Sequence, residues 1–241
     1  MRINVHAGHN PDGKIACGAI GLIKESTEAR KVKDEVIRFL RLAGHTVYDC
    51  TVENGTSQSN VLTNIIKKCN TNTVDLDVSI HFNSGANDKC GNNKSTGAEV
   101  LLYGANSKAK TYAERVCKSI SELGFRNRGI KYNTSLYFLR KTNAPAMLIE
   151  CCFVDDADDV KIYDYQSMAK AIVKGIIGHN IEETKNTDSD KESQAAGSET
   201  ATGNEKAVYR VQVGAYSIKN NAEAMEEKLK KAGFEAFITK A

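Results

Sequence analysis

Several features that would place a protein in a particular class are missing from this chain of 241 residues. No run of 18 apolar residues is present, so a membrane-spanning helix is not expected. The amino terminus lacks a basic segment followed by an apolar one, which predicts synthesis in the cytoplasm without a secretory signal. The net charge is +3, but the Lys and Arg residues form no cluster of the kind that binds nucleic acid. Nucleic acid is therefore not expected as a partner.

The seven cysteines also lack a pattern, because none of them forms a C-x-x-C pair. This spacing argues against a disulfide framework and against a structural zinc cluster, and favours a reduced protein. Cys151 and Cys152 are adjacent to Glu150 and offer a possible thiol nucleophile. A catalytic thiolate needs an electropositive setting and a histidine partner. Neighbouring thiols in an apolar run are more often packing residues, which is the interpretation we favour.

Short apolar runs alternate with amphipathic segments over the first 180 residues. A period of about 3.6 residues predicts helices, and short apolar or alternating runs predict strands. The expected strands are 2–6, 45–50, 74–83, 96–104 and 144–153, and the expected helices are 26–43, 58–69, 107–124 and 166–180. This order predicts an α/β fold with three layers, in which helices flank a mainly parallel central sheet. We therefore assign residues 1–180 to one α/β domain.

The remaining residues divide into two parts of different composition. Residues 182–206 contain no Val, Leu, Ile, Phe or Tyr and carry seven acidic and three basic side chains. Such a segment buries too little apolar surface to fold, so 181–206 is predicted to be a flexible linker. Residues 207–241 have the pattern of a single β-α-β unit. A unit of this size is too small to form a full core by itself.

Three polar residues lie where predicted apolar strands end, namely His9, His81 and Glu150. The carboxyl ends of parallel strands meet at one edge of a sheet, where sites of α/β proteins form. Two imidazoles and one carboxylate form a zinc site with an open position, and a second carboxylate off the metal moves the proton. The sequence offers two acids for these roles, Glu150 and an acid in the turn "IKESTEA". The residues alone thus indicate a possible metal hydrolase, with His6 assigned to packing.

The ordered segments "INVHAGHN", "KESTEARKVKDEVIRFLRLAGHTV", "DVSIHFNSG", "GAEVLLYG" and "APAMLIECCFVDD" resemble the zinc-dependent N-acetylmuramoyl-L-alanine amidases. They are most similar to the clostridial endolysin and autolysin branch, over residues 1–180. The resemblance implies that His9 and His81 bind Zn²⁺ and that Glu150 is the catalytic acid and base. One motif departs from the family pattern, because Ala7 and Asn10 stand where Pro and Gly are common.

The resemblance also implies a glutamate ligand near the start of the first long helix. Glu25 lies 19 residues before Gly44 and Glu28 lies 16 before it. The spacing in the family favours Glu25, with Glu28 as the alternative. Asn83, two residues after His81, is expected to orient substrate. Loops at 84–96 and 127–143 are expected to line the cleft.

The tail segment "YRVQVGAYSIKNNAEAMEEKLKKAGFEAFI" resembles the first half of a SPOR domain. SPOR domains bind peptidoglycan glycan strands that have lost their peptides, which makes Gln212 a candidate for glycan binding. The resemblances together imply a peptidoglycan amidase, and the absence of a visible secretory signal predicts that it reaches the wall after release or by a non-standard export route. The alternatives are a zinc carboxypeptidase-like peptidase and a wall-binding protein without catalysis. The sequence does not predict an oligomeric state.

Overall fold

The computed structural model describes residues 1–181, 223, 225–227, 229–230 and 237–238. The predicted linker after Ile181 and the candidate Gln212 lie outside these described residues. The chain divides into two compact units, Met1–Asn186 and Thr187–Ala241. The first unit contains every predicted ligand and catalytic residue.

The first unit is built on one six-stranded sheet. Its strands are β1 (Arg2–Ala7), β2 (Thr46–Asp49), β3 (Leu76–Asn83), β4 (Ala98–Leu102), β5 (Asn127–Tyr132) and β6 (Ala146–Phe153). They lie in the order β2-β1-β3-β6-β4-β5. All neighbouring pairs are parallel except β4 and β6, which are antiparallel. The expected mainly parallel sheet is therefore confirmed.

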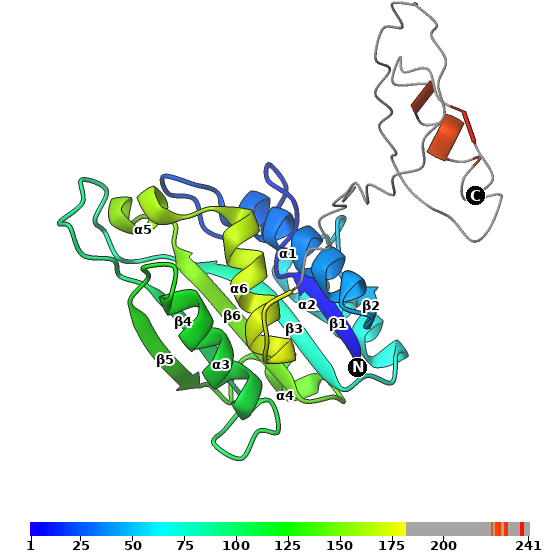
Figure 1. The fold of residues 1–241 in the computed structure, drawn as a ribbon. Helices are drawn as coiled ribbons and strands as arrows, with labels where there is room; N and C mark the ends of the chain where they lie inside the picture. Colours follow the sequence, from blue (N-terminus) through cyan, green and yellow to red (C-terminus); the bar gives the residue numbers. More distant parts are fainter. Residues whose placement is uncertain (182–222, 224, 228, 231–236, 239–241) are drawn as a thin grey trace, which may run out of the picture. The chain divides into compact units, whose positions relative to one another are not determined.

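Helices cover both faces of this sheet, as Figure 1 shows. They are α1 (Glu25–Leu42), α2 (Gln58–Thr71), α3 (Lys110–Ser121), α4 (Tyr137–Lys141), α5 (Ala157–Ile162) and α6 (Tyr165–Ile177). We call the face covered by α1, α6 and α3 the first face, and the face covered by α2 and α4 the second face. The three-layer prediction is confirmed.

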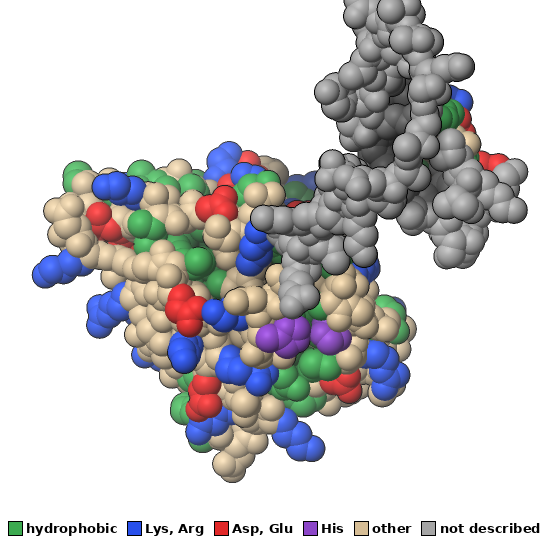
Figure 2. Space-filling view, viewed as in Figure 1, with side chains coloured by type: hydrophobic (Ala, Val, Ile, Leu, Met, Phe, Trp, Pro, Cys, Tyr) green, Lys and Arg blue, Asp and Glu red, His purple; other side chains and the backbone are tan. Residues whose placement is uncertain are grey.

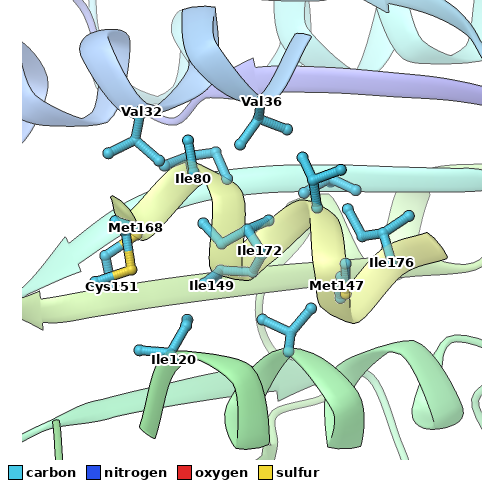
Figure 3. Close-up of a cluster of buried hydrophobic side chains, with 14 of the residues drawn as sticks. Val32, Val36, Ile80, Ile120, Met147, Ile149, Cys151, Met168, Ile172 and Ile176 are labelled. Carbon is cyan, nitrogen blue, oxygen red and sulfur yellow. The ribbon is translucent and has the colours of Figure 1, made fainter. Parts of the chain in front are cut away.

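The main core lies between the sheet and α6, which packs between α1 and α3 (Figure 3). Ile80, Ile149 and Ile172 are fully buried there. Because side chains alternate along a strand, their neighbours in sequence point to the second face. His81 and Glu150 are such neighbours, so the apolar core on the first face directs both polar side chains to the second face.

The segment 127–143, expected to be a loop, contains β5 and α4 instead. The sequence "NRGIKY" of β5 has no apolar alternation, because this strand lies at the edge of the sheet and none of its residues is fully buried. The short helices α4 and α5 have five and six residues, too few to show a helical period.

Among the described residues, no helix is long and apolar enough to cross a membrane. On the face shown in Figure 2, basic and acidic side chains are interspersed over the first unit. That view shows no concentration of one charge sign over the helices of the first face.

Candidate metal centre

His9, Glu25 and His81 come together at the carboxyl end of β1 and β3. One ligand-type atom from each residue lies within 4.8 Å of the others. The Glu25 carboxylate lies between the two imidazoles, with Oε1 3.2 Å from His9 Nε2 and 2.9 Å from His81 Nδ1. The two rings meet edge to face at 4.9 Å between centroids. This cluster could hold a metal ion.

Glu25 is the first residue of α1 and is almost completely buried. Backbone amides fix both of its oxygens: Ala19 N donates to Oε2 at 2.7 Å and Phe82 N donates to Oε1 at 3.2 Å. Burial alone would raise the pKa of this carboxyl, but hydrogen bonds from His81 and His9 hold it well below its usual range. The carboxyl therefore stays ionised, the form that binds a metal.

Burial lowers the pKa of the His81 imidazole, although Glu25 acts in the opposite direction. The lower pKa favours the neutral ring, which is the form that coordinates metals. His81 lies directly over Gly8, where an added Cβ would approach within 1.8 Å of the ring. Gly18 has a φ of +81°, and a Cβ there would lie 2.4 Å from Glu25 Oε2. Both glycines therefore leave room for the cluster.

The loop that carries His9 is held by two side chains for which the sequence analysis predicted no role. Arg30 on α1 donates from Nη2 to the carbonyl oxygen of His9 at 2.7 Å. Asn10 is fully buried and donates from Nδ2 to the carbonyls of Ile15 and Gly55. A buried polar residue needs hydrogen-bond partners, but the sequence does not show which residues these are, because they are brought together only by the fold.

Glu28, the alternative ligand, lies outside the cluster. Its carboxylate accepts hydrogen bonds from Lys31 Nζ at 2.8 Å and from Tyr163 Oη at 3.1 Å. His6 lies on the second face, where its ring contacts Phe138 at 4.7 Å between centroids. The geometry thus brings Glu25, rather than Glu28 or His6, to the other two predicted ligands.

Glu150 lies beside His81 on the neighbouring strand, and the two residues pair in register. Its Oε2 atom is buried and has no hydrogen-bond partner among the described residues. Burial, with smaller contributions from Glu25 and Glu99, raises the pKa of Glu150 to about 8. A buried oxygen without a partner, next to a metal-type cluster, fits a group whose partner is a bound ion, water or substrate.

Asn83 lies near the end of β3, where its Nδ2 donates to Glu99 Oε1 at 3.1 Å. Glu99 pairs in register with Glu150 from the other side. The sequence analysis did not single out Glu99, although a carboxylate within the apolar strand "AEVLL" is the same signal that identified Glu150.

Cys151 and Cys152 are buried, and burial raises the pKa of both thiols well above the usual range. These thiols are unsuited to nucleophilic attack.

Residues 3–178 match the family model described as N-acetylmuramoyl-L-alanine amidase. The chain belongs to this family. Residues 190–240 match the SPOR domain model, a match that begins within the stretch predicted as linker.

Individual proteins resemble the chain at moderate identity. The chain is 37% identical over 190 residues to an uncharacterized protein of Clostridium perfringens, with 76% of this chain and 53% of the relative covered. It is 29% identical to the sporulation-specific N-acetylmuramoyl-L-alanine amidase of Bacillus subtilis, with 68% and 56% covered. The chain thus spans about half the length of these relatives.

Solved amidase structures share the fold. The catalytic domain of CD27L endolysin, which targets Clostridium difficile, matches with a TM-score of 0.66 and 27% identity, covering 75% of this chain and 99% of that one. The amidase AmiC2 of Nostoc punctiforme matches with a TM-score of 0.60 and 24% identity, covering 74% and 96%. The architecture described above is therefore the catalytic-domain fold of this family.

One prediction concerns the pH dependence of stability in the metal-free protein. The Glu150 carboxyl has a pKa of about 8 in the fold against 4.5 in its unperturbed state. Between these values the folded state keeps a proton that the unfolded state has lost, so raising the pH weakens folding, by at most about 1.4 kcal/mol per pH unit. Other groups with shifted pKa values titrate alike in wild type and Glu150→Gln, so the difference between the two free energies of unfolding isolates Glu150. Urea unfolding in EDTA should show the stability of wild type falling relative to that of Glu150→Gln between pH 5 and 8, and a constant difference would contradict the assignment.

Proposed function

We propose that the chain is a zinc-dependent N-acetylmuramoyl-L-alanine amidase, which hydrolyses the amide between N-acetylmuramic acid and L-alanine in peptidoglycan. The observation that carries the proposal is the His9–Glu25–His81 cluster with Glu150 on the adjacent strand. Family membership supports the reaction, and the cluster supports the cofactor.

The three residues fit a catalytic zinc ion. Two histidine nitrogens and one carboxylate oxygen are a known catalytic ligand set, which leaves a coordination position open. Bound there, zinc would supply Lewis acidity toward the amide carbonyl and the attacking water. The backbone amides of Ala19 and Phe82 would keep Glu25 oriented as a ligand.

Glu150 would move the proton. In its ionised form, the carboxylate takes a proton from the attacking water, and it then donates this proton to the departing alanine nitrogen. The metal-free pKa of about 8 shows that burial favours the protonated form. A cation beside Glu150 would favour the ionised form and lower this pKa. Asn83 would orient the substrate through its side-chain amide.

The tail would hold the enzyme on its substrate. A SPOR domain in residues 190–240, with Gln212 as a glycan contact, would bind strands from which peptides have been removed. Tethering the catalytic domain to such strands would raise its local concentration on partly digested wall. The protein would then act at the cell wall, with peptidoglycan as substrate and binding partner.

Digestion of purified peptidoglycan tests the proposed reaction. The full chain should release alanine amino groups without producing new reducing sugars. EDTA should abolish the release and added zinc should restore it. New reducing ends would instead indicate a glycosidase, and loss of a terminal amino acid from muropeptides would indicate a carboxypeptidase. Binding without any product would indicate a wall-binding protein.

A substitution at Gly8 probes the packing of the ligand His81. Gly8→Ala places a Cβ where the His81 ring now lies, so the ring must move out of the cluster. We expect zinc affinity to fall by at least about tenfold, since even outer residues of metal sites have effects of this size. Gly104→Ala is the matched control, because nothing lies within 4 Å of its added Cβ. Zinc titration of both variants is the measurement, and equal affinities would contradict the packing argument.

A further inference from the structure

A row of ionisable side chains crosses the second face from the metal cluster to the edge of the sheet. His81 on β3 pairs in register with Glu150 on β6, and Glu150 pairs with Glu99 on β4. On β5, Arg128 Nε donates to Glu99 Oε2 at 2.6 Å. Neighbouring strands lie about 4.8 Å apart. The Glu99 strand is therefore one such spacing from Glu150, on the side away from His81.

Arg128 is held in place but keeps donor capacity. Its Cζ lies 4.9 Å from the centroid of the Phe153 ring, and Nη1 donates to the Thr96 carbonyl oxygen at 3.4 Å. Among the described residues, partners are found for Nε and Nη1, while Nη2 makes no hydrogen bond. The side chain is 28% exposed, so a molecule from solvent can reach it. A fixed, planar guanidinium with a free N–H is suited to binding a carboxylate.

The backbone of β5 accounts for the placement of Arg128. The register between β4 and β5 shifts between Ala98 and Val100, and Gly129 has a φ of +73°. This irregularity sets Arg128 against Glu99 and returns Ile130 to its pairing with Val100 on the first face. Helix α3 packs on β4 and β5 from the first face. On the second face, Arg128 keeps 28% of its side chain exposed, whereas Glu99 beside it is buried.

The chemistry of the proposed reaction indicates on which side of the metal cluster the stem peptide of the substrate would lie. The general acid must lie within hydrogen-bond reach of the leaving nitrogen. If Glu150 is this acid, the alanine nitrogen would lie on the Glu150 side of the cluster, and a stem peptide leaving away from His81 would run toward β4 and β5. Consecutive Cα atoms are 3.8 Å apart. The free carboxylate of the second residue, D-glutamate, would lie about 6–7 Å beyond the scissile nitrogen, close to one strand spacing past Glu150.

We propose that Arg128 binds this D-glutamate carboxylate and so determines a preference for stem peptides that carry it. The inference rests on the proposed amidase function and adds the orientation of the substrate to it. Glu99 is the positioning residue that holds the guanidinium, and Phe153 supports the guanidinium from one side. The partner is defined by its chemistry, a carboxylate one residue beyond the cleaved bond.

Two substrates that differ only in this group test the inference. They are N-acetylmuramoyl-L-Ala-D-Glu and the corresponding D-isoglutamine compound, in which a carboxamide replaces the carboxylate. The measurement is the ratio of kcat/KM for the two substrates with the full, zinc-loaded chain. Wild type should favour the carboxylate by about tenfold or more, the size of a charged hydrogen bond. Arg128→Gln should bring the ratio close to one, mainly by raising KM for the carboxylate substrate.

Two further variants complete the test. Arg38→Gln removes an arginine that is also paired with a glutamate, Glu35, but on α1 of the first face. It should keep the wild-type ratio. Arg128→Lys keeps the charge and should keep part of the preference, which a purely structural role would not predict.

The possible outcomes separate the inference from the proposed function. A wild-type ratio near one, or a wild-type ratio that survives in Arg128→Gln, overturns the role of Arg128. An equal loss on both substrates also overturns it, because it indicates a disturbed Glu99–Glu150 pair rather than a lost contact. If wild type cleaves neither compound between muramic acid and alanine but hydrolyses another bond, the proposed function fails instead.

Discussion

Glu150→Gln is expected to reduce amide hydrolysis by about 10²–10⁴-fold while the protein keeps its metal. Glutamine has nearly the same shape as glutamate but cannot accept and return a proton. Glu150 is not one of the three clustered ligand residues, so its replacement leaves His9, Glu25 and His81 intact. Initial rates on a soluble muropeptide and metal content of the same sample are the two measurements.

Asn83→Ala is the matched comparison for this variant. Asn83 lies on the neighbouring strand and contacts Glu99, but it has no proton to transfer. Its loss should change KM more than kcat, whereas Glu150→Gln should change kcat. Normal turnover in Glu150→Gln would mean that another group is the general base.

Glu25→Gln is expected to lower zinc affinity by at least about 100-fold, whereas Glu28→Gln should bind zinc as wild type does. Glu25 Oε1 contacts both imidazoles, and its negative charge attracts the zinc cation, an attraction that the neutral glutamine lacks. Glu28 instead accepts hydrogen bonds from Tyr163 and Lys31. The glutamine side-chain oxygen can still accept the hydrogen bond from Tyr163, so Glu28→Gln loses only the ion pair with Lys31, which should reduce the free energy of unfolding by less than about 1 kcal/mol.

Competition with a chelator of known affinity measures zinc binding in the two variants. Urea unfolding of the metal-free proteins measures the stability effect separately. The assignment of ligands is wrong if Glu28→Gln loses zinc and Glu25→Gln keeps it. Because the two glutamates are three residues apart on one helix, the pair differs little in helix propensity or surface charge.

The strand-end histidines and the strand-buried glutamate could be identified from sequence because each interrupts an apolar run. His81 and Glu150 follow isoleucines that form the core of the first face, so strand alternation directs them to the opposite face. The choice between Glu25 and Glu28 could not be made from these residues alone and relied on the spacing from the ligand glutamate to the glycine that ends the helix in the resembled family. The first turn of a helix can present either residue, and the structure places Glu25 in the cluster through the amides of Ala19 and Phe82.

Other features could not be predicted because their causes are long-range. Strand β5 has no apolar alternation and exists because β4 offers it an edge to pair with. The contact between Arg128 and Glu99 joins residues 29 positions apart across a local shift in register. The support of His9 by Arg30 depends on how α1 packs against the loop after β1. The predicted role of Gln212 lies outside the described residues and stays a prediction.

Hydrolysis in H₂¹⁸O is the most direct test of the central claim. The zinc-loaded full chain is incubated with a defined muropeptide, and the products are analysed by mass spectrometry. The account predicts one ¹⁸O atom in the new lactyl carboxylate of N-acetylmuramic acid and a stem peptide with an unlabelled, free alanine amine. Label in a peptide carboxylate or at a sugar carbon, with the lactyl amide intact, would contradict the account.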